Sequence, residues 1–304
     1  MISAEKLRAA REGWAVGPVL APAVLRATGK DAQDYLHRMT TQDVNRLAPG
    51  ASAYAAVLNA KGHLLADAHV LVEPDGVLLV LDAAAAAEAR AHLEKFVIMD
   101  DVAFEDLSAS LRVLPLLGPA VEAKLPASAA SAGRIANERR GAPCLDLLVS
   151  AGGAGELRAA VVAQGATPLD EDDLEALRIL AGIARLGVDM DASRLPMEAG
   201  LTRAAISFSK GCYTGQEVVL RATVRGHLQR GLVQLSLPPA AGAGTVLTAG
   251  GQEVGVVTSV AETPDGRVGL GYLRRAHWRE GERVEAGGAD AVVRRVIVED
   301  GLPA

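Results

Sequence analysis

Residues 210–217 read Lys-Gly-Cys-Tyr-Thr-Gly-Gln-Glu, the stretch of this chain that constrains its fold and chemistry most. Thr214 followed by Glu217 is the pattern of a capping box, in which a hydroxyl and a carboxylate satisfy N–H groups at a helix start. The apolar residues after Glu217 predict that a helix continues from there. Cys212 would then lie just ahead of the helix, where the positive end of the helix dipole favours a thiolate over a thiol.

Positive charge surrounds this cysteine in the sequence. Lys210 precedes Cys212 by two residues, and Arg221 and Arg225 follow on the predicted helix. Lys210 is also the only lysine after Lys124, which indicates that an ammonium is required there, with chance as the alternative. Cationic neighbours activate thiols, so we predict a nucleophile, a redox thiol or a contact to a cluster shared with a partner. The alternative is a small buried residue.

The overall composition excludes several classes of protein. The chain has 304 residues, of which 50% are hydrophobic and 22% charged, and no apolar run is long enough to span a membrane. Its N-terminus lacks the pattern of a secretory signal, so we expect a cytoplasmic protein. Two cysteines cannot supply the four ligands of a zinc or iron–sulfur site within one chain. The net charge of −6 argues against direct nucleic-acid binding over a broad face, but it leaves room for one local basic groove.

The pattern along the chain predicts an α+β protein with a β-rich end. Apolar strands at 53–58 and 64–72 flank a turn, and an alanine-rich helix is expected at 83–99. A second block of strands and helices occupies 111–182. Six short runs between 231 and 298, separated by glycine and proline turns, predict a small closed barrel.

The octapeptide resembles the signature of the YgfZ family, which are folate-binding proteins related to the T-protein (aminomethyltransferase) of the glycine cleavage system. Other segments resemble the same family: Gly29-Lys30-Asp31-Ala32, Leu58-Asn59-Ala60-Lys61-Gly62, Pro196-Met197-Glu198-Ala199 and Gly269-Leu270-Gly271-Tyr272. The resemblance therefore covers most of the chain.

This resemblance implies an α+β fold of two interleaved α/β lobes with antiparallel sheets, plus a C-terminal six-stranded β-barrel, around a central folate-sized hole. The expected division assigns residues 1–48 and 109–226 to the first lobe, which carries the octapeptide. Residues 49–108 would form the second lobe and residues 227–304 the barrel.

The resemblance also implies a function and a set of site residues. The cofactor would be tetrahydrofolate or a derivative, and the partners iron–sulfur assembly or client proteins, including enzymes that thiolate transfer RNA. Cys212 and Lys210 would carry the chemistry. The expected folate-binding residues are Asp67, Arg178, Tyr213, Gln216, Glu217, Arg221 and Arg225. Two alternatives come from local spacing, because Glu217 also suits a helix cap and Arg221 lies four residues after it, as in a helix-surface ion pair.

One departure from the aminomethyltransferases bears on the activity. Their helix corresponding to residues 178–182 has a glutamate that hydrogen-bonds the pterin, and here that position is Leu180. Leucine cannot pair with the donor–acceptor edge of a pterin. A folate-dependent transferase of one-carbon or aminomethyl groups is therefore the alternative function, and an accessory protein in iron–sulfur cluster assembly or maintenance is the leading one.

Overall fold

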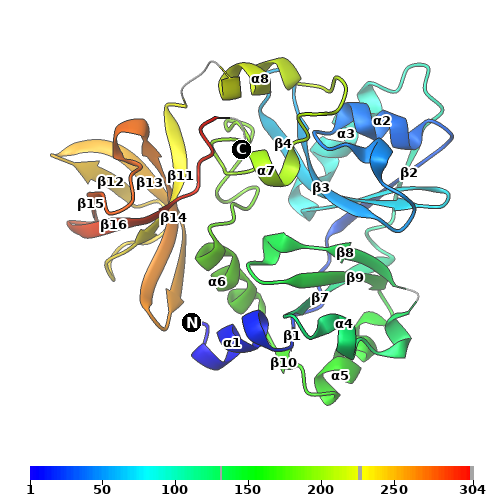
Figure 1. Ribbon diagram of the computed structural model, residues 1–304, viewed down its shortest axis with the longest axis horizontal. Helices are drawn as coiled ribbons and strands as arrows, with labels where there is room; N and C mark the ends of the chain where they lie inside the picture. The colour runs from blue at the N-terminus through cyan, green and yellow to red at the C-terminus, as the bar shows by residue number, and fades with distance from the viewer. Residues whose placement is uncertain (131, 225–227, 302–304) are drawn as a thin grey trace.

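The computed structural model describes residues 1–130, 132–224 and 228–301. Two lobes that contain antiparallel strands lie on one side, a β-barrel lies on the other, and helix α6 runs between them (Figure 1). No helix in the described ranges is long and apolar enough to cross a membrane.

The first lobe is built on a five-stranded sheet with the order β10-β1-β7-β9-β8, in which only the β1–β10 pair is parallel. Apolar side chains from the sheet and from the helix at 154–163 form its core, including Trp14, Leu114 and Val161. Its elements are α1 (Ala4–Glu12), β1 (Ala15–Val16), β7 (Leu111–Leu117), α4 (Val121–Lys124), β8 (Gly133–Ala136), β9 (Cys144–Ser150), α5 (Ala154–Ala163) and β10 (Thr167–Pro168).

The second lobe has an antiparallel sheet with the order β3-β4-β5-β2-β6. Two helices cover it, and Tyr35, Leu36 and Leu93 fill the space between helices and sheet. Its elements are β2 (Ala23–Thr28), α2 (Ala32–Met39), β3 (Ser52–Leu58), β4 (Leu64–Glu73), β5 (Gly76–Leu81), α3 (Ala86–Lys95) and β6 (Ala103–Asp106). The hairpin predicted at 53–72 is confirmed.

The boundary between these lobes differs from the expected one. β2 and α2 fall within residues 1–48, which the expected division placed with 109–226. The structure places them in the second lobe, because β2 pairs with both β5 and β6 in that sheet. Local patterning identified the strand and the helix, but the long-range pairing of β2 decided the sheet to which they belong.

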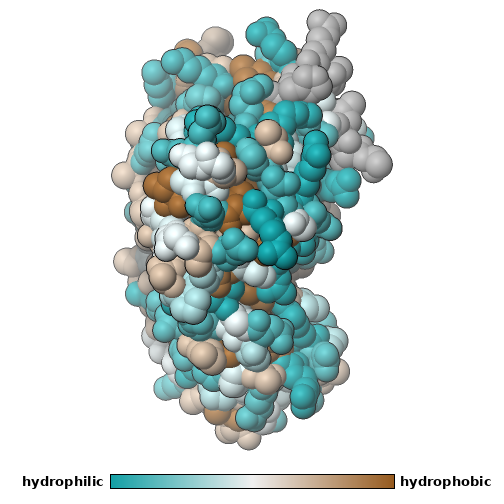
Figure 2. Space-filling model, turned by 90° about the vertical axis from the view of Figure 1, so that its left-hand side faces the viewer, coloured by the Kyte–Doolittle hydropathy of each residue, from teal (hydrophilic) through white to brown (hydrophobic). Residues whose placement is uncertain are grey.

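The C-terminal lobe is a closed barrel with the order β11-β14-β13-β12-β15-β16, which confirms the predicted six strands. Val233, Leu247 and Val293 are among the buried side chains of its interior. Figure 2 shows the barrel end of the molecule, where hydrophilic side chains cover most of the face and smaller hydrophobic areas lie between them. The strands are β11 (Arg230–Ser236), β12 (Val246–Ala249), β13 (Gln252–Thr263), β14 (Gly266–Arg274), β15 (Arg283–Ala286) and β16 (Ala289–Val296).

Helix α6 (Glu171–Ala181) connects the first lobe to the barrel. It begins with a capping box between Asp170 and Asp173 and ends at Gly182, whose φ of 73° suits glycine. Between these caps its apolar face packs against β13 and β14. Two short helices follow in the chain, α7 (Thr202–Ala205) and α8 (Gln216–Val224).

Candidate functional site

A cavity of about 430 Å³ lies where the two α+β lobes meet the C-terminal end of α6. This volume is within the range of small-molecule sites. Side chains from β3, β4, β7, β9 and α6 line it, so residues from both lobes contribute. Its polar lining consists of Tyr54, Asp67, His69, Asp82, Asn137, Arg139, Arg140, Asp146, Arg178 and Arg185.

One wall of the cavity is formed by β3 and β4. Asp67 and His69 point to the same face of β4, because side chains alternate along a strand, and Ala68 between them is buried on the other face. The Tyr54 hydroxyl donates to Asp67 Oδ2 at 2.5 Å. The Arg139 guanidinium lies 4.5 Å from the centre of the Tyr54 ring and donates to the Ala184 carbonyl at 2.7 Å. These contacts hold an acid, a phenol and a cation together.

Burial raises the pKa of the Asp67 carboxyl, although the positive charge of Arg139 opposes the shift. Burial also raises the pKa of the Tyr54 hydroxyl well above its usual value. A carboxyl with a raised pKa can donate a proton as well as accept a hydrogen bond. Asp67 is thus suited to the mixed donor and acceptor edge of a heterocyclic ligand.

The opposite wall is a hydrogen-bonded network on β9 and the segment after β8. Asn137 Nδ2 donates to Asp146 Oδ2 at 2.6 Å, and Arg140 Nη2 donates to the same oxygen at 2.9 Å. Burial alone would raise the pKa of Asp146, but the charge and hydrogen bonds of Arg140 hold it below its ordinary value. Burial lowers the pKa of His69 to about 4, so its imidazole is neutral at pH 7. Its Nδ1 is buried and has no hydrogen-bond partner among the described residues.

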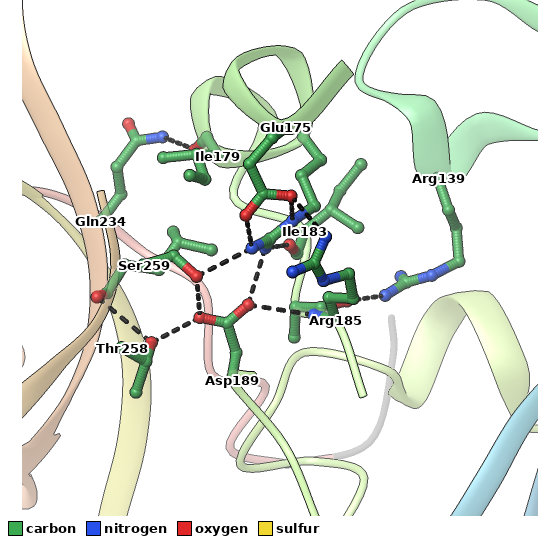
Figure 3. Close-up of polar contacts among 12 residues, drawn as sticks. Arg139, Glu175, Ile179, Ile183, Arg185, Asp189, Gln234, Thr258 and Ser259 are labelled. Atoms are coloured by element: carbon green, nitrogen blue, oxygen red, sulfur yellow. Dashed lines mark hydrogen bonds and ion pairs between the residues drawn. The ribbon is translucent and has the colours of Figure 1, made fainter. Parts of the chain in front are cut away.

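Arg178 lines this cavity, and its guanidinium is fully engaged by groups that include Glu175 and Asp189, both labelled in Figure 3. Its five N–H groups donate to the Glu175 carboxylate, the Ile183 carbonyl, Asp189 Oδ2 and Ser259 Oγ, with 2.6 Å to Asp189 and 2.8 Å to Ser259. A guanidinium has five N–H donors in all. Arg178 therefore joins α6 to strand β13 of the barrel and supports the cavity wall, and no donor remains for a ligand.

The octapeptide lies outside the cavity, at the C-terminal end of α2. Lys210 Nζ donates to the carbonyls of His37, Thr40 and Gln42, at 2.8 Å from Thr40 and 2.9 Å from Gln42. Carbonyls at the end of a helix lack partners within that helix and attract a cation. Burial lowers the pKa of Lys210 to about 8. Three acceptors match the three N–H groups of an ammonium, so Lys210 anchors this segment to α2.

Cys212 is exposed, and the next residue, Tyr213, is buried. The predicted capping box between Thr214 and Glu217 does not form. The Thr214 hydroxyl lies 3.7 Å from a methionine sulfur, and α8 begins after Gly215, where Gln216 Oε1 accepts from the Tyr213 N–H at 3.4 Å. Gly215 has a φ of 82°, and a Cβ there would lie 2.7 Å from a carbonyl oxygen, so the turn that presents Cys212 requires glycine.

Glu217 and Arg221 form the ion pair that was the alternative to a ligand role. Arg221 Nη2 lies 2.5 Å from Glu217 Oε1, and both side chains are well exposed, at 70% and 83%. Arg225 lies outside the described residues.

The structure separates the predicted site residues into two groups. Asp67 and Arg178 line the cavity. The described residues of the octapeptide region do not line it: Lys210, Cys212, Tyr213, Gln216, Glu217 and Arg221. Sequence reasoning missed Tyr54, His69 and Arg139, of which only His69 had a local signal, its spacing of two from Asp67 on a predicted strand.

Comparisons with known proteins agree with this architecture. Residues 2–134 match the family model described as the GCVT N-terminal domain, and residues 229–297 match the one described as the CAF17 C-terminal beta-barrel domain. The crystal structure of glycine cleavage system aminomethyltransferase T from Bartonella henselae has a TM-score of 0.81, covers 96% of this chain and 88% of its own, and is 22% identical. That identity supports a common fold alone.

Two relatives of the chain come from different kinds of protein, an aminomethyltransferase and an iron–sulfur cluster assembly factor. An aminomethyltransferase of Rubrobacter xylanophilus is 31% identical over 268 residues, which cover 81% of this chain and 72% of that protein. The mitochondrial iron–sulfur cluster assembly factor IBA57 homolog of Mycosarcoma maydis is 29% identical over 241 residues, which cover 73% of this chain and 57% of that protein. With a GCVT-type N-terminal domain, a CAF17-type barrel and relatives of both kinds, the chain belongs to the YgfZ family, which is related to the aminomethyltransferase T-proteins.

Proposed function

We propose that this protein binds tetrahydrofolate and acts as an accessory protein in iron–sulfur cluster assembly or maintenance, with Cys212 as its reactive thiol. In that role it would indirectly support the enzymes that thiolate transfer RNA. One observation carries the proposal. Asp67 lines a cavity, and Cys212 is exposed outside that cavity, on a turn that Lys210 anchors.

Folate fits the chemistry of the cavity. Asp67 and Tyr54 lie on the wall formed by β3 and β4, and Arg139 faces them from the first lobe. His69 lies on the same wall, and its Nδ1 has no hydrogen-bond partner among the described residues. These groups would hold the donor–acceptor edge of the pterin, with Asp67 as its carboxyl partner. When bound, tetrahydrofolate supplies nitrogens that carry one-carbon groups. The chain's own contribution is to bind and orient the ring and to keep a protonatable carboxyl beside it.

Cys212 is suited to meet another protein. Its side chain is exposed, and Lys210 fixes its segment to the end of α2. Because Lys210 gives its N–H groups to carbonyls, we assign it a positioning role and not proton transfer. One cysteine cannot hold a cluster alone, so the remaining ligands would come from the partner. The name of the Mycosarcoma maydis relative supports a role in cluster assembly.

A one-carbon transferase is the second candidate, because of the 31% identity to an aminomethyltransferase and the position of Asp67. Leu180 counts against it, since its side chain packs against the hydrophobic core around α6 and offers no carboxylate. Turnover of a methylated amine with tetrahydrofolate, at a rate unchanged in Cys212→Ala, would favour the transferase.

Folate binding is tested by titrating the purified protein with tetrahydrofolate in an anaerobic calorimeter. Asp67→Ala removes the proposed carboxyl partner and should weaken binding by about 10- to 100-fold, the effect of losing one hydrogen bond to a charged or strongly polar group. Asp75→Ala is the matched control, because Asp75 is an exposed turn residue paired with Arg26. Equal affinities for wild type and Asp67→Ala would remove Asp67 from the site.

The role of the thiol is tested in a strain that lacks the protein, with the activity of a [4Fe–4S] enzyme as the readout. Cys212→Ala should fail to restore that activity. Cys144→Ala should restore it, because burial raises the pKa of the Cys144 thiol well above its usual value and makes it unreactive. Full recovery with Cys212→Ala would exclude this thiol from the mechanism.

A further inference from the structure

Four arginines gather at the end of the barrel where β11 begins and β14 ends. Arg230, Arg274, Arg275 and Arg279 line an open hollow of about 950 Å³ around Trp278, and we call this feature the arginine hollow. The residues come from two parts of the chain more than 40 positions apart, since Arg230 opens β11 and the others follow one another at 274–279. The hollow is separate from the folate cavity, and the inference drawn from it does not depend on the proposed function.

The strand register creates an electrostatic cost in this hollow. Arg230 and Arg274 are direct Cα partners in the antiparallel β11–β14 pair. Like charges placed directly opposite each other in a sheet destabilise it. A bound anion beside the two arginines would offset that repulsion, in addition to what Glu198 does for Arg230.

Protein carboxylates neutralise only part of this charge. Arg275 Nη2 lies 2.6 Å from Asp300, and Arg230 Nε lies 3.6 Å from Glu198. Within the described ranges, no ion pair or side-chain hydrogen bond engages the exposed guanidiniums of Arg274 and Arg279. Two of the four arginines are therefore available for a ligand.

The composition of the hollow favours a nucleic acid over an acidic protein. Protein interfaces have an apolar centre, whereas nucleic-acid interfaces are polar and strongly positive. The apolar lining here consists of Ala276 and Trp278, and the Arg275 guanidinium already lies 5.5 Å from the centre of the Trp278 ring. Since Asp300 engages this stacked guanidinium, the ligand contacts fall to Arg274 and Arg279, whose guanidiniums can pair with phosphate.

We propose that the arginine hollow binds phosphate groups of the backbone of a nucleic acid. Net charge did not predict this contact, because a value of −6 averages over the whole chain while four guanidiniums are concentrated at one place. Backbone contacts of this kind give affinity without sequence preference and depend steeply on salt.

The experiment measures the binding of a fluorescein-labelled 20-nucleotide single-stranded RNA by anisotropy, at 50 to 200 mM KCl. Arg274→Ala/Arg279→Ala should weaken binding about tenfold at 100 mM KCl. The slope of log affinity against log salt should fall by about 1.4, or about 0.7 for each lost phosphate contact on a single strand. Arg274→Lys/Arg279→Lys should keep most of the affinity, since lysine also pairs with phosphate.

The charge-matched control is Arg46→Ala/Arg283→Ala, which removes two exposed arginines that pair with Asp43 and Asp290 elsewhere on the molecule. It should bind RNA within about twofold of wild type. Arg274→Ala alone should leave the melting temperature unchanged or raise it by about 1 °C, because it removes the repulsion from Arg230.

Four results would overturn the proposal. Two of them are an RNA affinity independent of salt and an equal loss in the control double variant. The third is displacement of RNA by poly-glutamate as effective as by a DNA oligonucleotide of equal charge, which would assign the hollow to an acidic protein. The fourth is displacement of RNA by the free ion. Inorganic phosphate is included as a competitor, and RNA displacement by it at low millimolar concentration would assign the hollow to the free ion.

Discussion

The ion-pair network between α6 and the barrel provides the sharpest test of how this fold is held together. Asp189 is almost fully buried and accepts from Arg178 Nη1 and Ser259 Oγ, both at 2.6 Å, and from Thr258 Oγ1 at 2.5 Å. It also accepts from the Arg185 backbone N–H at 3.0 Å. One carboxylate thus connects α6, the segment after it and β13 (Figure 3).

Asp189→Ala would leave the guanidinium of Arg178 buried, with Glu175 as its remaining charged partner. Removing one partner of a buried ion pair costs about 3–5 kcal/mol. At about 2 °C per kcal/mol, the lower end of the range for large domains, the melting temperature should fall by roughly 6–10 °C. Because Ile183 and Arg178 also line the cavity, tetrahydrofolate affinity should fall as well.

Differential scanning calorimetry of the variant measures this shift directly. Asp290→Ala is the control, since Asp290 pairs with Arg283 at 3.1 Å on the surface, where an ion pair contributes at most about 1 kcal/mol. Arg178→Met/Asp189→Leu should recover part of the loss, because it leaves neither charge buried alone. A melting temperature for Asp189→Ala within 2 °C of wild type would refute the reasoning.

Three further predictions concern the cavity and the octapeptide turn. The pKa of His69 is about 4 in the folded protein and about 6.5 in the unfolded chain. Between these pH values the unfolded chain binds a proton that the folded protein does not. About 3 kcal/mol of stability, present above pH 6.5, should therefore be lost as the pH falls toward 4. In urea unfolding of His69→Gln between pH 7 and 4, the free energy of unfolding should fall less with pH than in wild type. An equal fall in both proteins would contradict the prediction. Gly215→Ala should destabilise the protein by 1 kcal/mol or more because of its φ of 82° and a carbonyl at 2.7 Å, whereas Gly152→Ala, with open space around it, should change the free energy of unfolding by less than about 0.5 kcal/mol. Tyr54→Phe removes the hydrogen bond to Asp67 and should weaken tetrahydrofolate binding about tenfold in the same calorimetric titration, and unchanged affinity would show that the phenol is not needed.

The sequence by itself determined those elements whose signals are local. The hairpin of β3 and β4, the capped helix α6 and the six barrel strands follow from alternation, turn residues and caps within a dozen neighbouring positions. The octapeptide likewise identified the segment that presents an exposed cysteine.

Only the tertiary structure decided which of these residues share a site. Lys210 reaches carbonyls some 170 positions away, and the Tyr54–Asp67 wall faces Arg139 from the other lobe. Arg230 meets Arg274 only because β11 pairs with β14. A periodic pattern specifies the face on which a side chain lies, but the partner opposite that face depends on how whole lobes pack, which is a property of the entire chain.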